Sequence, residues 1–302
     1  MDYAEEQRQR WNGAAGHAWV ASQAVLDRLF EPFADRLADL AAARRPDQLL
    51  DVGCGTGSTT VAIARRLGTT APCVGVDISE PMLAAARARV DREGVAATFI
   101  CADAQTYPFE PGSFDLIVSR FGVMFFQDSV EAFANLRRAA RDRSELRMIV
   151  WRGPADNPFM TVAQGAAASV LPLPERQPDA PGQFAFANDQ RVRGILRDSG
   201  WSGVEFRPVD IACAMPEREL VGYFTRFGPV GMALQNADER TRAQVIEAVR
   251  PAFDRYVHGD EVRFTAACWM VSARADANAG YPDATRSAAD PLTPAARPAA
   301  GP

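Results

Sequence analysis

Short apolar runs alternate with segments of helical periodicity between residues 48 and 151, and this alternation restricts the folds that the chain can adopt. Two helical segments, STTVAIARRLG and EPMLAAARARVDREG, separate the first three apolar runs, which read QLLDVG, PCVGVD and ATFICAD. Two further runs, FDLIVS and ELRMIVW, flank a helical stretch near 128–142. Strands joined by helices run parallel, because each helix returns the chain to the same end of the sheet. The pattern predicts an α/β fold with helices on both faces of a parallel sheet.

The ends of the predicted helices carry residues that suit those positions. Ser79 can cap the second helix of the alternation, and Pro81 fits its first turn. Gly68 and Gly94 follow the last residues of the first and second helices, where glycine commonly ends a helix. Residues 1–44 also predict a helix, which we expect to be broken near Pro32 because proline lacks a backbone N–H.

The alternation ends after Trp151. The segment 154–190 contains LPLPERQPDAPG, whose four prolines predict a loop. Beyond it we predict a helix over about 188–199, an extended run GVEFRPVDIACA, helices near 217–235 and 238–256, and a last strand EVRFTAACWMVSA. From about residue 275 the composition narrows to Ala, Pro, Asp and Gly, which predicts a disordered tail.

The first strand runs directly into a loop with three glycines, Gly53-Cys54-Gly55-Thr56-Gly57. A phosphate-binding P-loop requires a lysine, and all 33 basic residues of this chain are arginine, so that class of site is excluded. Asp77 ends the next strand, where a carboxylate can accept hydrogen bonds from ribose hydroxyls. It indicates a ribose without identifying the ligand. A nicotinamide dinucleotide stays open, although its fingerprint is GxGxxG rather than GxGxG.

The third and fourth strands narrow the choice of ligand. Asp103 lies just past the third strand, where its carboxylate can accept a hydrogen bond from an adenine amino group. Ala102 and Ala104 leave room beside it for the adenine ring. The fourth strand brings further residues to the carboxyl edge of the sheet, where open α/β sheets bind ligands: Ser119, Arg120 and Phe121.

With these motifs in order, the chain resembles the class I S-adenosylmethionine-dependent methyltransferases. The matching segments are LLDVGCGTG, VGVDIS, CADAQ and FDLIVSRF, and within the superfamily the chain is most similar to the UbiE-type small-molecule methyltransferases. The resemblance covers roughly residues 45–152 through specific motifs, and 1–44 and 153–274 only loosely. The chain departs from many relatives in RRAARDRSELRM, where they carry a Pro-Gly-Gly turn, so the geometry of that turn is left open.

The resemblance implies a Rossmann-like fold. The sheet would have seven mostly parallel strands with helices on both faces, an antiparallel last strand, and a helical and loop cap inserted after the fifth strand. The implied regions are an N-terminal helical lid at 1–44, a cofactor-binding core at 45–152, an acceptor-binding cap with the sixth strand at 153–260, the last core strand at 261–274 and a disordered tail at 275–302.

The resemblance also implies that the cofactor is S-adenosyl-L-methionine. The glycine loop would approach the methionine carboxylate, aided by the N-terminus of the following helix. Asp77 would hold the ribose, Ile78 and Met82 would pack on the adenine, and Asp51 is either a partner for the loop amides or a ligand contact. The expected cofactor-binding residues are Trp19, Asp51, Gly53, Gly55, Thr56, Gly57, Asp77, Ile78, Met82, Ala102, Asp103, Ala104 and Ser119.

The implied activity is transfer of a methyl group, by in-line displacement, to an apolar or aromatic small molecule in a biosynthetic reaction. The sulfonium is an activated leaving group, so alignment is the protein's main task and a base is needed only for an acceptor of high pKa. The candidate catalytic residues are His17, near the expected lid residues Trp11 and Trp19, and Arg120, which is open to pairing with an acceptor carboxylate or a structural acid. His258 suits a surface turn.

Two features of the acceptor side stay open at this point. The cap carries aromatic and apolar residues that suit either an acceptor pocket or the cap's own core: Phe159, Met160, Phe184, Phe186, Tyr223, Phe224, Phe227 and Met232. The scarcity of candidate bases favours an alternative function, a methyltransferase-fold protein that binds the cofactor without methylating and serves as a scaffold, a regulator or a catalyst of other chemistry.

Composition disfavours several other classes of protein. A net charge of −5 without a basic block makes nucleic acid an unsuitable partner. The five cysteines are widely spaced, which argues against a metal site or disulfide framework and suits a reducing compartment. No apolar run approaches the ~20 residues of a membrane span, and MDYAEEQRQRW lacks the pattern of a signal peptide. We expect a cytoplasmic protein whose oligomeric state is open, a homodimer included.

Overall fold

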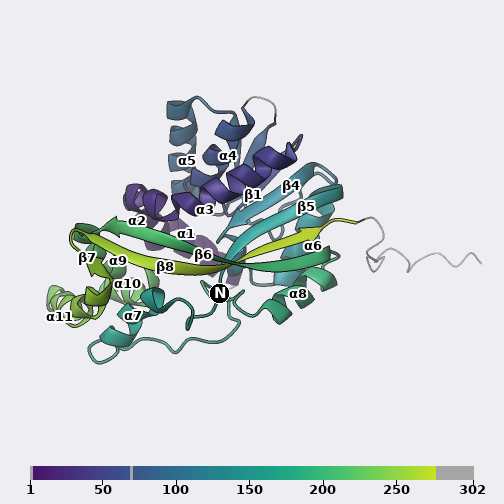
Figure 1. Cartoon of the computed structure of the whole chain (residues 1–302). Helices are drawn as coiled ribbons and strands as arrows, with labels where there is room; N and C mark the ends of the chain where they lie inside the picture. Colours follow the sequence, from purple (N-terminus) through teal and green to yellow (C-terminus); the bar gives the residue numbers. More distant parts are fainter. Residues whose placement is uncertain (1–2, 69–70, 277–302) are drawn as a thin grey trace, which may run out of the picture.

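The computed structural model describes residues 3–68 and 71–276, which form one eight-stranded sheet with helices around it (Figure 1). The predicted tail falls mostly on residues 277–302, outside the described residues. Seven strands follow the order β3-β2-β1-β4-β5-β8-β6, and β7 pairs with β8 beside this path. The strands are β1 Leu49–Val52, β2 Cys73–Asp77, β3 Ala97–Cys101, β4 Phe114–Arg120, β5 Ala140–Trp151, β6 Ser202–Pro216, β7 Val257–His258 and β8 Glu261–Arg274.

The direction of the strands confirms the Rossmann-like fold. Strands β3, β2, β1, β4 and β5 pair in parallel, and the last strand, β8, is antiparallel to both β5 and β6. The short β7 is an addition that the sequence did not predict. The chain order of the strands reverses at β1, which has β2 on one side and β4 on the other. Loops that leave the carboxyl ends of two such strands diverge, and the crevice between them is the usual binding site of open α/β sheets.

Helices cover both faces of the sheet (Figure 1). Helices α3 (Gln23–Arg44), α4 (Ser58–Leu67) and α5 (Glu80–Glu93) pack on one face, and α6 (Ser129–Ala139) and α8 (Asp189–Asp198) on the other. The remaining helices are α1 Tyr3–Asn12, α2 Ala14–Ala21, α7 Pro158–Ala167, α9 Leu220–Arg226, α10 Gly228–Ala233 and α11 Glu239–Val249, with 3-10 turns η1 Val123–Phe125, η2 Glu217–Glu219, η3 Leu234–Asn236 and η4 Arg250–Tyr256.

Helix α3 corrects the expectation of a break near Pro32. The helix continues through Pro32, which lies on its exposed side. The opposite side buries Leu29, Phe33 and Leu37 completely. Tertiary packing of an apolar face supplies most helical stability in proteins, so it outweighs the hydrogen bond that proline removes.

The loop predicted over 154–190 is also wrong in part, because it contains helix α7. Pro158 lies in the first turn of this helix, where proline is tolerated, and the four prolines of LPLPERQPDAPG follow the helix. The helices predicted near 217–235 and 238–256 exist but are divided into shorter α and 3-10 pieces. Gly228, with a φ of +68°, marks one division.

Several local predictions are confirmed. The Ser79 hydroxyl accepts a hydrogen bond from the Met82 backbone N–H at 3.4 Å, and Gly68 and Gly94 end their helices with φ of +66° and +63°. Where many relatives carry a Pro-Gly-Gly turn, this chain already forms strand β5, whose pairing with β4 shifts register between Ala140 and Glu145. Arg143 lies in this irregular stretch with a φ of +63°, and its backbone N–H donates to the Ala275 carbonyl at 2.8 Å.

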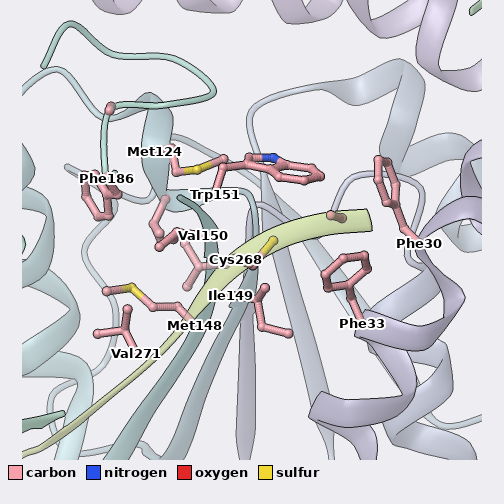
Figure 2. Close-up of a cluster of buried hydrophobic side chains, with 14 of the residues drawn as sticks. Phe30, Phe33, Met124, Met148, Ile149, Val150, Trp151, Phe186, Cys268 and Val271 are labelled. Atoms are coloured by element: carbon pink, nitrogen blue, oxygen red, sulfur yellow. The ribbon is translucent and has the colours of Figure 1, made fainter. Parts of the chain in front are cut away.

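The core is built in layers against β5 and β8 (Figure 2). Side chains alternate along β5, so Met148 and Val150 lie on the side of Phe186 while Ile149 lies on the side of Phe33 from α3. All five side chains are almost completely buried. Burial on both faces explains why the strand reads as a continuous apolar run rather than an alternating one.

Strands β6 and β8 extend beyond the rest of the sheet. The pairing of β5 with β8 ends at Trp151 and Cys268, whereas β6 and β8 stay paired as far as Pro216 and Glu261. Helices α7, α9, α10 and α11 gather beside this extension at one end of the molecule (Figure 1). The ring of Phe159 on α7 stacks on Phe264 of β8 with centroids 3.8 Å apart, which fixes the helices to the extension.

Among the helices of residues 3–68 and 71–276, none is both long and apolar enough to cross a membrane.

Asn157 joins the segment after β5 to β8, and its loss should destabilise the fold. Its amide exchanges two hydrogen bonds of 2.9 Å with the backbone of Ala267, and the residue is 1% exposed. Asn157→Ala leaves the buried Ala267 N–H without that acceptor, which should lower the free energy of unfolding by about 1–3 kcal/mol. Urea unfolding measures the change, with exposed Asn236→Ala as the control. Equal stability of the two variants would contradict this role.

Candidate functional site

A cavity of about 1090 Å³ opens at the carboxyl ends of β1, β2 and β4, between the sheet and the helices around the β6–β8 extension. Its wall combines the loops after these strands, helices α1 and α2, the segment 174–188, and helices α7, α9 and α10. The volume exceeds the roughly 300–1,000 Å³ of a typical cleft for one small ligand. The cavity therefore has room for two small molecules side by side.

The glycine loop forms one end of the cavity. Gly53, Gly55 and Gly57 all have positive φ, of +68°, +55° and +76°. A Cβ on Gly55 would meet only the Met82 sulfur, at 3.8 Å, so the loop backbone is open to the cavity there. A Cβ on Gly57 would lie 2.9 Å from Ala86 Cβ, so Gly57 serves the packing of α5 instead. Helix α4 begins at Ser58, directly after this loop.

Asp77 at the end of β2 links the loops beside it. One carboxylate oxygen accepts a hydrogen bond from the Gly55 N–H at 2.8 Å and the other from the Ser79 N–H at 2.9 Å. Burial raises the pKa of Asp77, although these backbone hydrogen bonds oppose that shift. The residue lines the cavity, and each of its oxygens keeps a lone pair for a ligand.

Most of the other expected cofactor residues also line the cavity. Asp103 accepts a hydrogen bond from the Gln105 N–H at 2.9 Å through one oxygen. Trp19 reaches the cavity from α2, edge-on to Trp11 at 6.4 Å and to Phe227 at 5.7 Å between ring centroids. The structure brings these expected residues together around the cavity: Trp19, Gly53, Gly55, Thr56, Asp77, Ile78, Met82, Ala102, Asp103 and Ala104.

Three expected residues, Asp51, Gly57 and Ser119, do not line the cavity. Asp51 is 1% exposed, and its carboxylate accepts a hydrogen bond of 2.6 Å from the Thr60 hydroxyl rather than from the loop amides. Ser119 is fully buried, donates to the Val52 carbonyl at 2.8 Å and accepts from the Gly122 N–H at 3.2 Å. These residues support the loops from behind.

The two candidate catalytic residues differ in their placement. His17 is exposed, with a ring nitrogen 2.8 Å from the Gly13 carbonyl oxygen, and it is not part of the cavity wall. Arg120 lines the cavity but is held by the protein, because it donates to the Ser58 hydroxyl at 2.8 Å and the Phe30 carbonyl at 3.2 Å. Burial lowers the pKa of Arg120 to about 10, so the guanidinium stays charged at neutral pH.

Sequence reasoning missed the pairing of Phe121 with Trp151. Phe121 has a φ of +65°, and its ring stacks on Trp151 with centroids 4.5 Å apart and planes 10° from parallel. Both residues line the cavity. The local sequence does not predict a left-handed backbone conformation at Phe121. The position of Trp151 at the carboxyl end of β5, on the same edge as the other site residues, was the available signal.

Helix α1 closes the cavity beside Asp77. The Asn12 side chain donates to the Ile78 carbonyl at 3.0 Å and accepts from the Glu80 N–H at 2.9 Å. The Ser79 hydroxyl donates to the Trp11 carbonyl at 2.6 Å. Three hydrogen bonds therefore hold the N-terminal helix against the loop between β2 and α5.

The opposite end of the cavity is largely apolar. Of the aromatic and apolar residues singled out beyond β5, Phe186 is buried in the core, and the others line the cavity: Phe159, Met160, Phe184, Tyr223, Phe224, Phe227 and Met232. The described part of the wall contains no histidine. Within the described residues, no group of three or more His, Cys, Asp or Glu side chains is arranged to hold a metal ion.

The buried Asp51 should make stability depend on pH. Burial raises its pKa from 3.8 to about 6, so the folded state binds this proton more tightly than the unfolded state does. Below about pH 4 Asp51 makes its whole contribution to the free energy of unfolding. This contribution decreases by roughly 3 kcal/mol as the pH rises through about 6. Asp51→Asn cannot titrate at this position. Between about pH 4 and pH 7, its free energy of unfolding should therefore rise relative to that of the wild type by up to this amount.

Urea unfolding across this pH range measures the effect, and Asp47→Asn, which removes an exposed carboxylate, is the control. A difference between Asp51→Asn and the wild type that does not change with pH would contradict the assignment.

Comparison with known proteins agrees with this geometry. Residues 49–143 match the family model described as a methyltransferase domain. A demethylmenaquinone methyltransferase from Thermus thermophilus is 33% identical over 154 residues, or 49% of this chain and 70% of the relative. A nocamycin O-methyltransferase from Saccharothrix syringae is 29% identical, over 64% of this chain and 73% of the relative. A crystal structure of a putative methyltransferase from Bacillus halodurans has the same fold, with a TM-score of 0.53, 14% identity, and coverage of 80% of this chain and 98% of that one.

The family match covers more than the glycine loop, because residues 49–143 include strands β1 to β4 and the loops that follow them. The chain belongs to the class I S-adenosylmethionine-dependent methyltransferases of the UbiE-like type, and it is an enzyme that transfers a methyl group from S-adenosyl-L-methionine to a small-molecule acceptor.

Proposed function

We propose that the cavity binds S-adenosylmethionine at its glycine-loop end and a flat, largely apolar acceptor at the opposite end. The observation that carries this proposal is the continuity of one large cavity, with motif residues at one end and aromatic residues at the other. In this assignment residues 1–44 act as a lid, 45–152 bind the cofactor, 153–260 form the acceptor cap with β6, and 261–274 complete the sheet.

The residues at the glycine-loop end fit the parts of S-adenosylmethionine. The open space at Gly55 would leave room for the methionine carboxylate, and the N-terminus of α4, directly after the loop, would supply N–H groups that suit an anion. Asp77 would accept hydrogen bonds from the ribose hydroxyls, and the free oxygen of Asp103 from the adenine amino group. Ile78 and Met82 would pack on the adenine ring. Ala102 and Ala104 would leave it space.

The remaining expected residues would act indirectly. Asp51, Gly57 and Ser119 would hold the loops in place, since they are buried behind them. Arg120 would position the start of α4 through Ser58. Trp19 would close the cavity together with α1. His17 has no part in this proposal, because it is exposed outside the wall.

S-adenosylmethionine supplies a methyl group that its sulfonium already activates. The protein's contribution is to hold the acceptor in line with this group and to exclude water, and alignment of this kind is worth up to roughly 7–11 kcal/mol. The aromatic end of the cavity suits a flat, apolar molecule. Relatives named for demethylmenaquinone and nocamycin support a small organic acceptor from biosynthesis.

We also propose that the enzyme acts in the cytoplasm without a nucleic-acid partner. Its five cysteines are free and four are buried, which suits a reducing compartment. A net charge of −5 disfavours contact with phosphate backbones.

Calorimetry with S-adenosylmethionine and its demethylated product, S-adenosylhomocysteine, tests the cofactor assignment. The wild type should bind both. Asp77→Ala and Asp103→Ala should each weaken binding by about tenfold or more, because each removes a charged acceptor of ligand hydrogen bonds. Glu80→Gln is the control, since Glu80 is near Asp77 but exposed and outside the wall. If the wild type binds neither compound, or both aspartate variants bind like the wild type, the proposal fails.

A further inference from the structure

The indole N–H groups of the five tryptophans fall into two sets. Three donate hydrogen bonds within the protein: Trp11 to Gln7 at 3.1 Å, Trp201 to Phe133 at 2.9 Å and Trp269 to Ala187 at 3.1 Å. Trp19 and Trp151 make no such bond to any described residue, and both line the cavity. An indole N–H that is buried usually has an acceptor, so the donor of the buried Trp151 points to an acceptor atom on a ligand.

Trp151 gives the stronger evidence for a bound acceptor atom, because its side chain is only 3% exposed. One face of its ring is covered by Phe121 at 4.5 Å, and Phe30 and Phe33 approach from α3 with centroids 6.3 Å away (Figure 2). Trp151 lines the cavity, and its nitrogen makes no hydrogen bond to a described residue. The ring is therefore held in place by its neighbours, and its N–H is left available to a ligand in the cavity.

Tyr223 on α9 provides a second donor in the same wall. Its hydroxyl is 3.2 Å from the sulfur of Met160, and a thioether is only a weak acceptor. The rings of Phe159 and Phe227 lie 5.7 and 5.8 Å from the Tyr223 ring. Burial raises the pKa of Tyr223 well above its ordinary value, so the phenol stays protonated and donates.

The acceptor end of the wall offers donors but no enclosed base. Asp77 and Asp103 are at the cofactor end, where backbone N–H groups hold them. The other two carboxylates of the described wall, Glu175 and Asp179, are exposed on the segment 174–188. This arrangement suits an acceptor that presents oxygen atoms and whose nucleophile ionises in solution rather than on the enzyme.

We propose that Trp151 and Tyr223 are acceptor-binding residues that donate hydrogen bonds to carbonyl or oxyanion oxygens of a flat, acidic enol or phenol. The inference rests on the proposed function, which places the acceptor at this end of the cavity. In the reaction, a lone pair of the ionised acceptor forms the bond to the methyl carbon. The carbon–sulfur bond breaks, and its electron pair stays on sulfur as the neutral thioether. No proton has to move to the protein.

Calorimetry on the complex with S-adenosylhomocysteine tests the donors with two flat probes. Lawsone is a naphthoquinone with two carbonyl oxygens and an enol that is ionised at neutral pH, whereas naphthylamine presents an N–H donor. The wild type should bind lawsone at least tenfold more tightly than naphthylamine. Trp151→Phe keeps an aromatic ring and removes the N–H, so it should weaken lawsone binding by about 10- to 100-fold, the loss expected for a hydrogen bond to a charged oxygen.

Tyr223→Phe is the second variant and should also weaken lawsone binding, by about tenfold. Trp201→Phe is the control, because its N–H already has a backbone acceptor away from the cavity, and its lawsone affinity should equal that of the wild type. Binding of S-adenosylhomocysteine, measured in the same samples, should be unchanged in all three variants. If it is absent in the wild type, the proposed function fails.

If S-adenosylhomocysteine binds, two results would overturn the donor inference alone. One is a wild type that does not prefer lawsone to naphthylamine. The other is a lawsone affinity that neither Trp151→Phe nor Tyr223→Phe reduces.

Discussion

The close approach of two backbones, at Gly53 after β1 and Gly122 after β4, is the contact on which the cavity depends. A Cβ on Gly53 would lie 2.5 Å from Gly122 Cα, and a Cβ on Gly122 would lie 2.5 Å from the Val52 carbonyl oxygen, so neither position has room for a side chain. This contact lets the Ser119 hydroxyl bridge both loops. Phe121, the residue before Gly122, adopts a left-handed conformation that costs of order 1–3 kcal/mol. Burial and stacking of its ring on Trp151 offset a cost of that size.

The residues assigned to the two ligands lie in different parts of the cavity wall. The carboxylates of Asp77 and Asp103 line the end that we assign to the cofactor, and Asp51 is buried behind the same loop. Trp151 and Tyr223, whose donors lack a strong protein acceptor, line the part that we assign to the methyl acceptor. Hydroxyl and amino groups of an adenosyl ligand need acceptors, whereas carbonyl and oxyanion groups need donors. The two ends are thus complementary to ligands of opposite hydrogen-bonding character, and this opposes binding of either molecule in the wrong place.

The sequence was sufficient to predict what repeats or is local. The alternation over 48–151 predicted the parallel strands, and Ser79, Gly68 and Gly94 marked helix ends because capping depends on neighbouring residues. Features that depend on distant packing were not predictable. The prediction that Pro32 breaks α3 was wrong. The buried face that keeps this helix intact forms only in the folded protein, so the local sequence does not reveal it. The motifs predicted which group of residues would lie at the site, but not which individual residues would face the cavity. Whether Asp51 faced a ligand or Thr60 was decided by which side of the loop packs on α4.

A continuous series of close contacts connects the glycine loop to Trp151. Gly53 touches Gly122, the neighbouring Phe121 donates its backbone N–H to the Ile149 carbonyl at 3.0 Å, and its ring stacks on Trp151. Arg120 and Ile149 are also paired in the parallel ladder of β4 and β5. A donor on β5 is therefore held by the sheet at a fixed place relative to the cofactor loop, whereas Tyr223 is held by short helices outside the sheet. In-line displacement depends on alignment to within fractions of an ångström. Trp151 can thus set the position of the acceptor, while Tyr223 and its aromatic neighbours select its shape.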